Sequence, residues 1–332
     1  MNDEQKLGAL LTYFDLMSTN GGSRIYRCGR ELGIFDAVGH GPVSSRDVAD
    51  TCGLQEGPVR LLLDGLCSIG TLTREDNSYS PALVTQFLSG NYQNLSDEYW
   101  DYLPQFLKTG TPLAKMDSIE QSEEQYEQQV SALAWMMAPA AEAVARLLGM
   151  GQARKGLEIL DVGAGSGIWS LTCAKHDPES NVTVNDWPVI VKIATGFAQK
   201  FGLQNRFSAI PGNYHEAELG NNQFDLAIVA NVTHIETPDG NVELFRKIHG
   251  ALKPGGEIAI VDVMPVQADG QISAALYALG LGLRTESGQV HSADALQTYL
   301  GDAGFKDSNM LPIEVPPYTM GMILGKKEAW PC

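Results

Sequence analysis

Three glycines at alternate positions, Gly163, Gly165 and Gly167, come directly after an apolar run of strand length, Leu157–Val162. A segment with helical character, Ile168–Lys175, follows at once. In α/β proteins a strand, a glycine turn and a helix start form a nucleotide site, because glycine lets the backbone approach the ligand and the helix-start N–H groups face it. The G-x-G-x-G spacing differs from the G-x-G-x-x-G of dinucleotide sites. The glycines therefore predict a nucleotide or nucleoside site of unspecified kind.

Carboxylates near this turn narrow the kind of site. Asp186 lies at the end of the second expected strand, 23 residues after Gly163. This is close to the roughly 20-residue spacing of a carboxylate that binds ribose hydroxyls. Asp161 directly precedes the turn, and Phe224-Asp225 opens a later strand. A nicotinamide cofactor is disfavoured by the glycine spacing but stays an alternative.

The second part of the chain alternates between strand-length apolar runs and helical segments, as in a parallel, doubly wound α/β sheet. The expected strands are Leu157–Val162, Asn181–Asn185, Arg206–Ile210, Phe224–Ala230 and Glu257–Val263, the last launched by a tight turn at Lys253–Gly256. The expected helices are Ile168–Lys175, Val189–Phe201, Asn241–Leu252, Ile272–Leu283 and Ser292–Ala303. Met310–Val315 and Tyr318–Leu324 predict a late antiparallel strand pair.

Residues 1–105 predict a mainly helical winged-helix domain. Helical segments at Arg24–Val38, Ser45–Cys52 and Glu56–Ile69 precede a hairpin pattern at Thr71–Tyr79. A winged helix often binds DNA, but this region has seven basic and fourteen acidic residues. Because DNA binding depends on Lys and Arg neutralising phosphates, a dimerisation module is favoured.

The composition is that of an acidic globular protein: 332 residues, 44% hydrophobic, 19% charged, with a formal net charge of -17. This charge disfavours nucleic acid as a partner. Five scattered cysteines without C-x-x-C spacing, and no signal-peptide pattern, predict reduced thiols in the cytoplasm. Ile272–Leu283 is the longest apolar stretch and is too short for a membrane span. No pair of histidines has metal-ligand spacing, so no metal is predicted.

Taken together, these motifs resemble the S-adenosylmethionine (SAM)-dependent O-methyltransferases with an N-terminal winged-helix dimerisation domain. This group includes the caffeic acid and acetylserotonin O-methyltransferases and bacterial natural-product enzymes. The resemblance covers nearly the whole chain and rests on four segments: Asp161–Gly167, Phe224–His234, Ala251–Gly256 and Ala303–Phe305. It implies a Rossmann-like class I methyltransferase fold at residues 106–332, a dimerisation domain at residues 1–105, SAM as cofactor and a homodimer.

The resemblance also implies a set of cofactor-binding residues: Gly163, Ala164, Gly165, Asp186, Trp187, Asn213, Tyr214 and Asn231. Asp186 would bind the ribose hydroxyls, and Trp187 would lie against the adenine. The family places an acidic residue for the adenine amino group where this chain has Asn213, whose side-chain oxygen can still accept a hydrogen bond. Asn231 would face the sulfonium side of the cofactor.

His234 matches the general base of the family, and Asp262 matches a carboxylate that orients that histidine. A second orienting glutamate of the family aligns with Val290. A hydrogen-bonded loop histidine is the alternative, but the end of a parallel strand next to the cofactor turn favours catalysis. The other histidines considered are expected at the surface: His176, His215, His249 and His291.

The acceptor is expected between the helix that carries Trp135, Met136 and Met137 and the helix around Tyr277, with Met264 on the floor. Met and aromatic walls suit a flat apolar, aromatic or polyketide-like molecule with a hydroxyl group. Alternatives remain open. The methyl group could go to carbon or nitrogen, or a SAM-binding relative could catalyse a different reaction or none.

Overall fold

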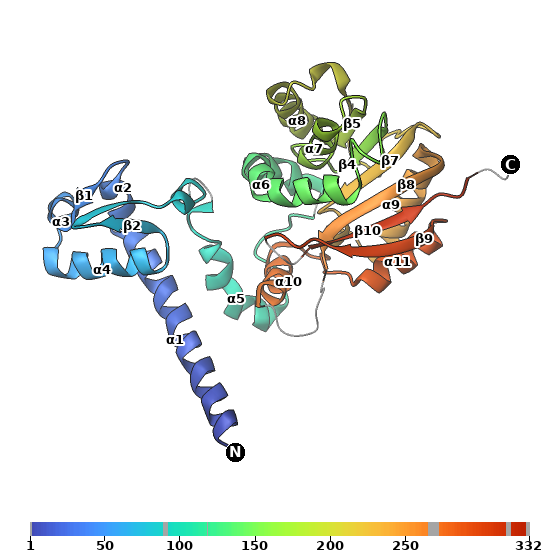
Figure 1. Cartoon of the computed structure of the whole chain (residues 1–332). Helices are drawn as coiled ribbons and strands as arrows, with labels where there is room; N and C mark the ends of the chain where they lie inside the picture. Colours follow the sequence, from blue (N-terminus) through green and yellow to red (C-terminus); the bar gives the residue numbers. More distant parts are fainter. Residues whose placement is uncertain (1, 89–91, 118, 265–271, 317–319, 330–332) are drawn as a thin grey trace. The chain divides into compact units, whose positions relative to one another are not determined.

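The computed structural model describes residues 2–88, 92–117, 119–264, 272–316 and 320–329. The chain divides into two compact units, Met1–Glu98 and Tyr99–Cys332 (Figure 1). The division falls in helix α5 (Asp97–Thr109), near the predicted domain boundary at residue 105. In the described part of the chain, no helix has the length and hydropathy needed to span a membrane.

The first unit combines helices with one small sheet. Its helices are α1 (Asp3–Glu31), α2 (Ile34–Val38), α3 (Ser45–Cys52), α4 (Glu56–Ser68) and the 3-10 helix η1 (Leu83–Gln86). Its strands β1 (Val43–Ser44), β2 (Leu72–Glu75) and β3 (Ser78–Pro81) form an antiparallel sheet in the order β1-β3-β2. The predicted hairpin is therefore present, and it closes a core around Leu63, Leu66 and Tyr79.

The second unit is built on a seven-stranded sheet in the order β6-β5-β4-β7-β8-β10-β9 (Figure 1). Its strands are β4 (Glu158–Val162), β5 (Asn181–Asp186), β6 (Phe207–Pro211), β7 (Phe224–Ala230), β8 (Leu252–Val263), β9 (Lys306–Pro312) and β10 (Met320–Lys326). Strands β4 to β8 pair in parallel, whereas β10 pairs antiparallel with β8 and β9. The predicted mostly parallel sheet with a late antiparallel pair is confirmed.

Helices cover both faces of this sheet because its central strands are apolar on both sides. On β7, Leu226 and Ile228 contribute to the core under α6 (Ile119–Leu147), α7 (Ile168–His176) and α8 (Pro188–Lys200). Ala227 and Val229 point to the other core, under α9 (Pro238–Ala251) and α11 (Ala293–Asp302). The remaining elements are α10 (Ile272–Arg284) and the 3-10 helices η3 (Gln204–Arg206) and η4 (Thr233–Ile235). In such a sheet, ligands bind beyond the carboxyl ends of the parallel strands.

Candidate active site

A cavity of about 640 Å³ lies at the carboxyl ends of β4, β5, β7 and β8. Its walls come from the loops after these strands and from the inner sides of α6 and α10. A volume of several hundred Å³ is the size range of small-molecule sites. The described residues that line it all belong to the second unit.

The glycine turn forms one wall of the cavity. Gly163, Gly165 and Gly167 have positive φ angles of 64°, 57° and 73°, which side chains rarely adopt. A Cβ atom on Gly163 would lie 2.5 Å from Cγ2 of Val232, and one on Gly165 would lie 3.1 Å from the Tyr126 hydroxyl. The backbone of the turn therefore approaches Val232 and Tyr126 more closely than a residue with a side chain could. The predicted residues Gly163, Ala164 and Gly165 all line the cavity, so this cradle fits a cofactor held by backbone groups.

Asp186 holds the turn in place. Its Oδ2 accepts the N–H of Gly165 at 2.7 Å, and its Oδ1 accepts the N–H of Trp187 at the same distance. A carboxylate has about four acceptor positions, so these two bonds are compatible with the predicted binding of ribose hydroxyls. Asp186 and Trp187 both line the cavity.

Two buried polar residues support the turn from behind. The Asp161 carboxylate is fully buried and accepts the Ser170 hydroxyl at 2.5 Å. Burial raises the pKa of Asp161 to about 7, although the hydrogen bonds from Ser170 oppose this. The carbonyl of Asn185 accepts the N–H groups of Gly163 and Ala164. Asp161 and Asn185 thus set the shape of the turn and do not themselves line the cavity.

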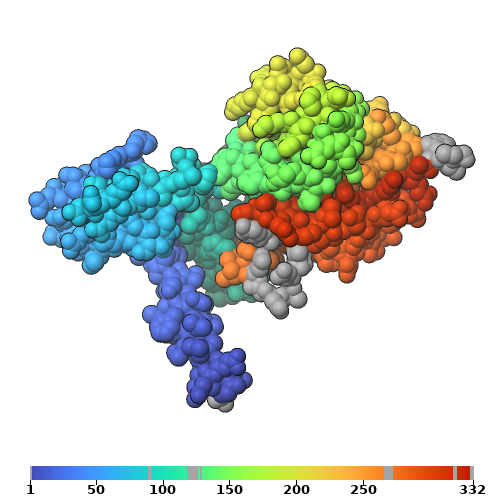
Figure 2. All heavy atoms as spheres, in the orientation of Figure 1, coloured from blue at the N-terminus to red at the C-terminus, as the bar shows by residue number. Residues whose placement is uncertain are grey.

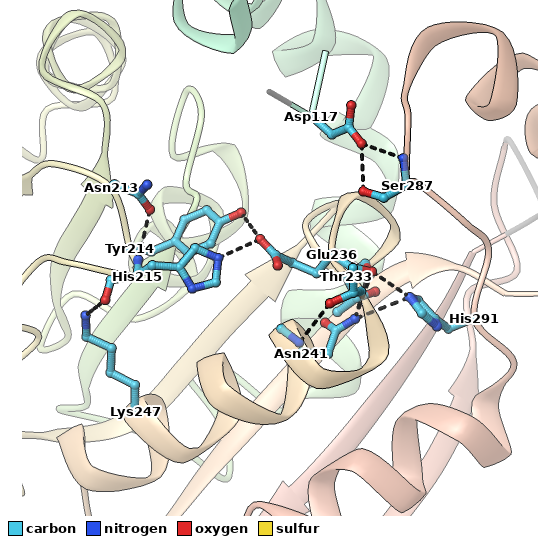
Figure 3. Close-up of polar contacts among 12 residues, drawn as sticks. Asp117, Asn213, Tyr214, His215, Thr233, Glu236, Asn241, Lys247, Ser287 and His291 are labelled. Carbon is cyan, nitrogen blue, oxygen red and sulfur yellow. Dashed lines mark hydrogen bonds and ion pairs between the residues drawn. The ribbon is translucent and has the colours of Figure 1, made fainter. Parts of the chain in front are cut away.

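A cluster around Glu236 forms a second wall. Figure 3 shows the Tyr214 hydroxyl and the His215 ring both pointing toward Glu236; the Oε1 of Glu236 lies 2.6 Å and 2.8 Å from them. Burial, and then the Glu236 charge, raises the pKa of Tyr214 well above its ordinary value. The hydrogen bond to Glu236 raises the pKa of His215. The predicted residue Asn213 also lines the cavity, but its Oδ1 accepts the N–H of His215 at 2.9 Å.

Asn231 adopts a left-handed conformation (φ 56°), in which Asn is one of the better-tolerated residues. Its N–H is bonded to the carbonyl of Val261, and the residue lines the cavity at the end of β7, as predicted.

His234 and Asp262 form a buried pair in the cavity wall. Nδ1 of His234 lies 2.7 Å from Oδ1 of Asp262, whose other oxygen accepts the Thr233 hydroxyl at 2.6 Å. Burial alone would raise the pKa of Asp262, but the His234 ring and these hydrogen bonds hold it below its usual value. Nε2 of His234 lies 3.2 Å from the hydroxyl of Tyr277. Burial, and then the Asp262 charge, raises the pKa of Tyr277, so Tyr277 is neutral near pH 7.

Asn241 and His291 are hydrogen-bonded to the main chain of the loop that carries His234. Nδ2 of Asn241 donates to the carbonyl of Thr233 at 3.0 Å and lies 3.3 Å from Nε2 of His291 (Figure 3). The prediction of a surface position for His291 is wrong, because this side chain is buried between the loop and Tyr299. Val290, which aligns with a glutamate of the family, packs against the core.

The predicted acceptor residues divide into two groups. Met137 and Tyr277 line the cavity, and Trp135, Met136 and Met264 are not among its described lining residues. The helix period explains why Trp135 and Met136 do not line the cavity. One side of α6 faces the cavity and carries Val130, Leu133, Ala134 and Met137. The strand period explains the position of Met264. Val263 faces the cavity, and Met264 packs in the opposite core and against Gly321.

Residues outside any sequence motif complete the cavity: Asp117, Glu236, Ser273, Arg284, Thr285 and Ser287. Asp117 accepts hydrogen bonds from the N–H of Glu286 and from the N–H and hydroxyl of Ser287, at 2.8 to 2.9 Å (Figure 3). Only the polar character of residues 285–287 after an apolar helix could have indicated this loop. Among the described residues, no group of three or more His, Cys, Asp or Glu is arranged to hold a metal ion.

Comparison with known proteins identifies the family. The O-methyltransferase domain family matches residues 92–306, which is more than half of the chain. The chain belongs to this family. The predicted resemblance is therefore confirmed, and SAM is the cofactor of the family to which the chain belongs.

Individual relatives differ in the atom they methylate. Mouse acetylserotonin O-methyltransferase is 26% identical over 287 residues, 72% of this chain and 69% of the relative. L-Tyrosine C(3)-methyltransferase of Streptomyces lavendulae is 28% identical over 173 residues, 51% of this chain. The chain spans about half the length (47%) of that enzyme.

Solved structures share the fold over nearly the whole chain. Human N-acetylserotonin methyltransferase in complex with SAM superposes with a TM-score of 0.74 at 22% identity, covering 99% of both chains. The mitomycin 7-O-methyltransferase MmcR superposes with a TM-score of 0.72 at 18% identity, covering 98% of this chain and 100% of the other.

Proposed function

We propose that the protein transfers a methyl group from SAM to a hydroxyl of a small aromatic or polyketide-like acceptor, with His234 as the general base. The observation that supports this most is the pair of contacts on the His234 ring. Nδ1 is bonded to the buried Asp262 carboxylate, and Nε2 lies beside the Tyr277 hydroxyl in the cavity. SAM, when bound, supplies a methyl group already activated by the sulfonium.

The role of Nε2 follows from the ionised state of Asp262, whose pKa is held below its usual value. A carboxylate cannot donate, so it fixes the hydrogen on Nδ1 and leaves Nε2 as the acceptor. The Tyr277 hydroxyl then donates to Nε2, which is the contact that an acceptor hydroxyl needs. Complete proton transfer from a phenol with a pKa near 10 to an imidazole near 6.5 would cost about 4.8 kcal/mol. Transfer concerted with attack avoids this cost, and Asp262 stabilises the imidazolium that forms.

Replacement of His234 by Ala tests the base. We expect methyl transfer from labelled SAM to a panel of phenols to fall by about 100-fold or more, the usual contribution of general base catalysis. Binding of S-adenosylhomocysteine, measured by calorimetry, should persist. His176→Ala is the matched control, because His176 pairs with Glu142 and is not among the described lining residues. Unchanged turnover in His234→Ala would remove His234 from the role.

Transfer to carbon is the second candidate, favoured by the similarity to the Streptomyces L-tyrosine C(3)-methyltransferase. Transfer to nitrogen and a SAM-dependent reaction without methylation also remain. The same labelled assay separates these candidates. Label in a methyl ether that survives alkali supports oxygen as the acceptor, and label on a ring carbon supports the second candidate. A product that forms without label supports a reaction other than methylation.

For the first unit we propose a winged-helix domain that joins two chains in a homodimer. Its three-stranded sheet and helices support this, and so does an exposed apolar stripe on α1, formed by Leu7, Leu10, Leu11, Phe14 and Met17. The acidic balance of residues 1–105 argues against a nucleic-acid partner. We also propose a cytoplasmic location and a role in secondary metabolism. The first rests on cysteines that are unpaired at all four described positions, the second on the natural-product relatives.

A further inference from the structure

Arg284, the last residue of α10, is the only lysine or arginine among the described residues that line the cavity. The whole chain carries a net charge of -17, so a cation inside this cavity stands out from the general charge pattern. Arginine is the side chain best suited to bind planar anions, because its guanidinium presents a rigid fork of N–H donors.

The guanidinium is held in position by two contacts of α10. Its Nε donates to the carbonyl of Gly280 at 2.9 Å, and its central carbon lies 5.9 Å from the centre of the Tyr277 ring. The backbone carbonyl of Arg284 accepts the N–H of Met116, which fixes the end of the helix. Since arginine has five N–H donors, these contacts orient the fork without using most of it.

Two acidic residues at the loop after α10, Asp117 and Glu286, have other partners. Asp117 accepts three hydrogen bonds from Glu286 and Ser287, and Glu286 forms an ion pair with Lys115 at 2.7 Å. Across the described residues, no carboxylate lies within 4 Å of the Arg284 guanidinium. A half-buried charge of this kind is stabilised by an anion that binds from the cavity.

Tyr277 connects this cation to the base. Its hydroxyl lies 3.2 Å from Nε2 of His234, and the guanidinium lies over the ring of the same side chain. The hydroxyl contact and the cation therefore lie on the same side chain of the cavity wall. A substrate that places a phenolic hydroxyl on His234 is thus close enough to reach Arg284 with a substituent.

We propose that Arg284 binds a carboxylate of the acceptor, so that the substrate class is a phenol that carries a carboxylic acid. This inference rests on the proposed methyl transfer to a hydroxyl. It adds a specificity-determining contact at the end of α10, outside the sequence motifs of the chain.

Paired probes test the contact. The probes are 4-hydroxycinnamate, 4-hydroxyphenylpropionate and 4-hydroxybenzoate, each compared with its methyl ester. Their binding to the full chain loaded with S-adenosylhomocysteine is measured by calorimetry. We expect the unmodified protein to bind at least one acid about 10- to 100-fold more tightly than its ester, as charge-assisted hydrogen bonds suggest. Arg284→Gln should lose this preference and bind the ester as before, whereas Arg284→Lys should keep part of it.

Lys192→Gln is the matched control, because it removes a positive charge from an exposed position on α8. Its acid preference should equal that of the unmodified protein. The proposal is overturned if the unmodified protein binds no acid more tightly than its ester, or if Arg284→Gln keeps the preference. Failure of the proposed function is distinguishable from failure of this inference. In that case the unmodified protein would bind no S-adenosylhomocysteine or would transfer no methyl group.

Discussion

The ion pair between His215 and Glu236 gives the cavity wall a dependence on pH. Nε2 of His215 lies 2.8 Å from Oε1 of Glu236, and this hydrogen bond is the main cause of the raised pKa of His215. The charge of Glu243 raises this pKa slightly, whereas burial and the charge of Lys247 lower it. A raised pKa means that the protonated histidine stabilises the fold. This contribution is complete below the unfolded value of about 6.5 and is lost as pH rises through the higher folded value.

Glu236→Gln should therefore lower the pKa of His215, measured by NMR titration of its ring proton. The melting temperature of the unmodified protein should exceed that of the variant most below about pH 6, and the difference should narrow toward pH 8.5. Glu243→Gln is the control, because its charge is the weakest contribution to the raised pKa and should change it less. A His215 pKa that stays the same in Glu236→Gln would contradict the assignment.

Among individual residues, the sequence predicted which residues after the strands belong to the site, but it did not predict the site residues on other segments. His234 follows β7 and Asp262 lies near the end of the neighbouring parallel strand β8; the family resemblance implied that they act together, and the structure pairs them. Glu236 and Arg284 have no motif, because their positions in the cavity depend on the turn of η4 and on where α10 ends. Trp135 was expected in the acceptor wall but is not among the described lining residues, since composition alone does not give the rotational phase of a helix.

Among the elements of the site, the conformation of the glycine turn between β4 and α7 is especially sensitive to one added Cβ atom. Replacing Gly163 by Ala places a Cβ atom 2.5 Å from Val232 and puts a side chain on a residue with φ 64°. The conformation alone costs about 1–2 kcal/mol for a non-glycine residue, and relief of the clash adds to this. We expect a clear loss of thermal stability and at least a tenfold loss of S-adenosylhomocysteine affinity, measured by calorimetry.

Gly196→Ala is the matched control for this substitution. Gly196 lies inside α8, and a Cβ atom there meets nothing within 4 Å. Alanine should stabilise this helix by about 0.4–1 kcal/mol and leave cofactor affinity unchanged. If Gly163→Ala binds S-adenosylhomocysteine as tightly as Gly196→Ala does, the turn is not the cofactor cradle.

Most elements of both units were predicted, but the single helix expected at Arg24–Val38 is wrong, because the chain forms α1 (Asp3–Glu31) and then the separate α2 (Ile34–Val38). Alternating apolar strands and helices have strong patterns, and β4, β5 and β7 begin or end within one residue of their predicted bounds. The predicted turn at Lys253–Gly256 lies inside the bounds of β8, which begins at Leu252; there the pairing with β7 shifts register and Gly255 has a φ of 82°, as a turn requires. The N–H of Gly255 and the carbonyl of Gly256 are both hydrogen-bonded to the main chain of Lys327, from a distant segment, and no local pattern indicates this pairing.

For the molecule as a whole, the distribution of apolar surface is more informative than the total charge. The net charge of -17 disfavours polyanionic partners. On α1, however, large apolar side chains recur at helical spacing and are exposed: Leu7, Leu10, Leu11, Phe14 and Met17, each at least 53% accessible. Figure 2 shows this end of α1 (dark blue) extending away from the rest of its own unit. A contiguous exposed apolar stripe of this kind is typical of a protein–protein interface.

The proposed homodimer is therefore expected to depend on this stripe. Leu11→Glu combined with Phe14→Glu introduces charges that a buried apolar interface cannot accommodate. Light scattering should give twice the chain mass of 35.9 kDa for the unmodified protein and the chain mass for the double variant. Leu61→Glu is the control, because Leu61 is exposed on α4 at the surface of the same unit, outside this stripe, and its variant should remain dimeric. A double variant that keeps the dimer mass, with an unchanged circular dichroism spectrum, would show that the interface lies elsewhere.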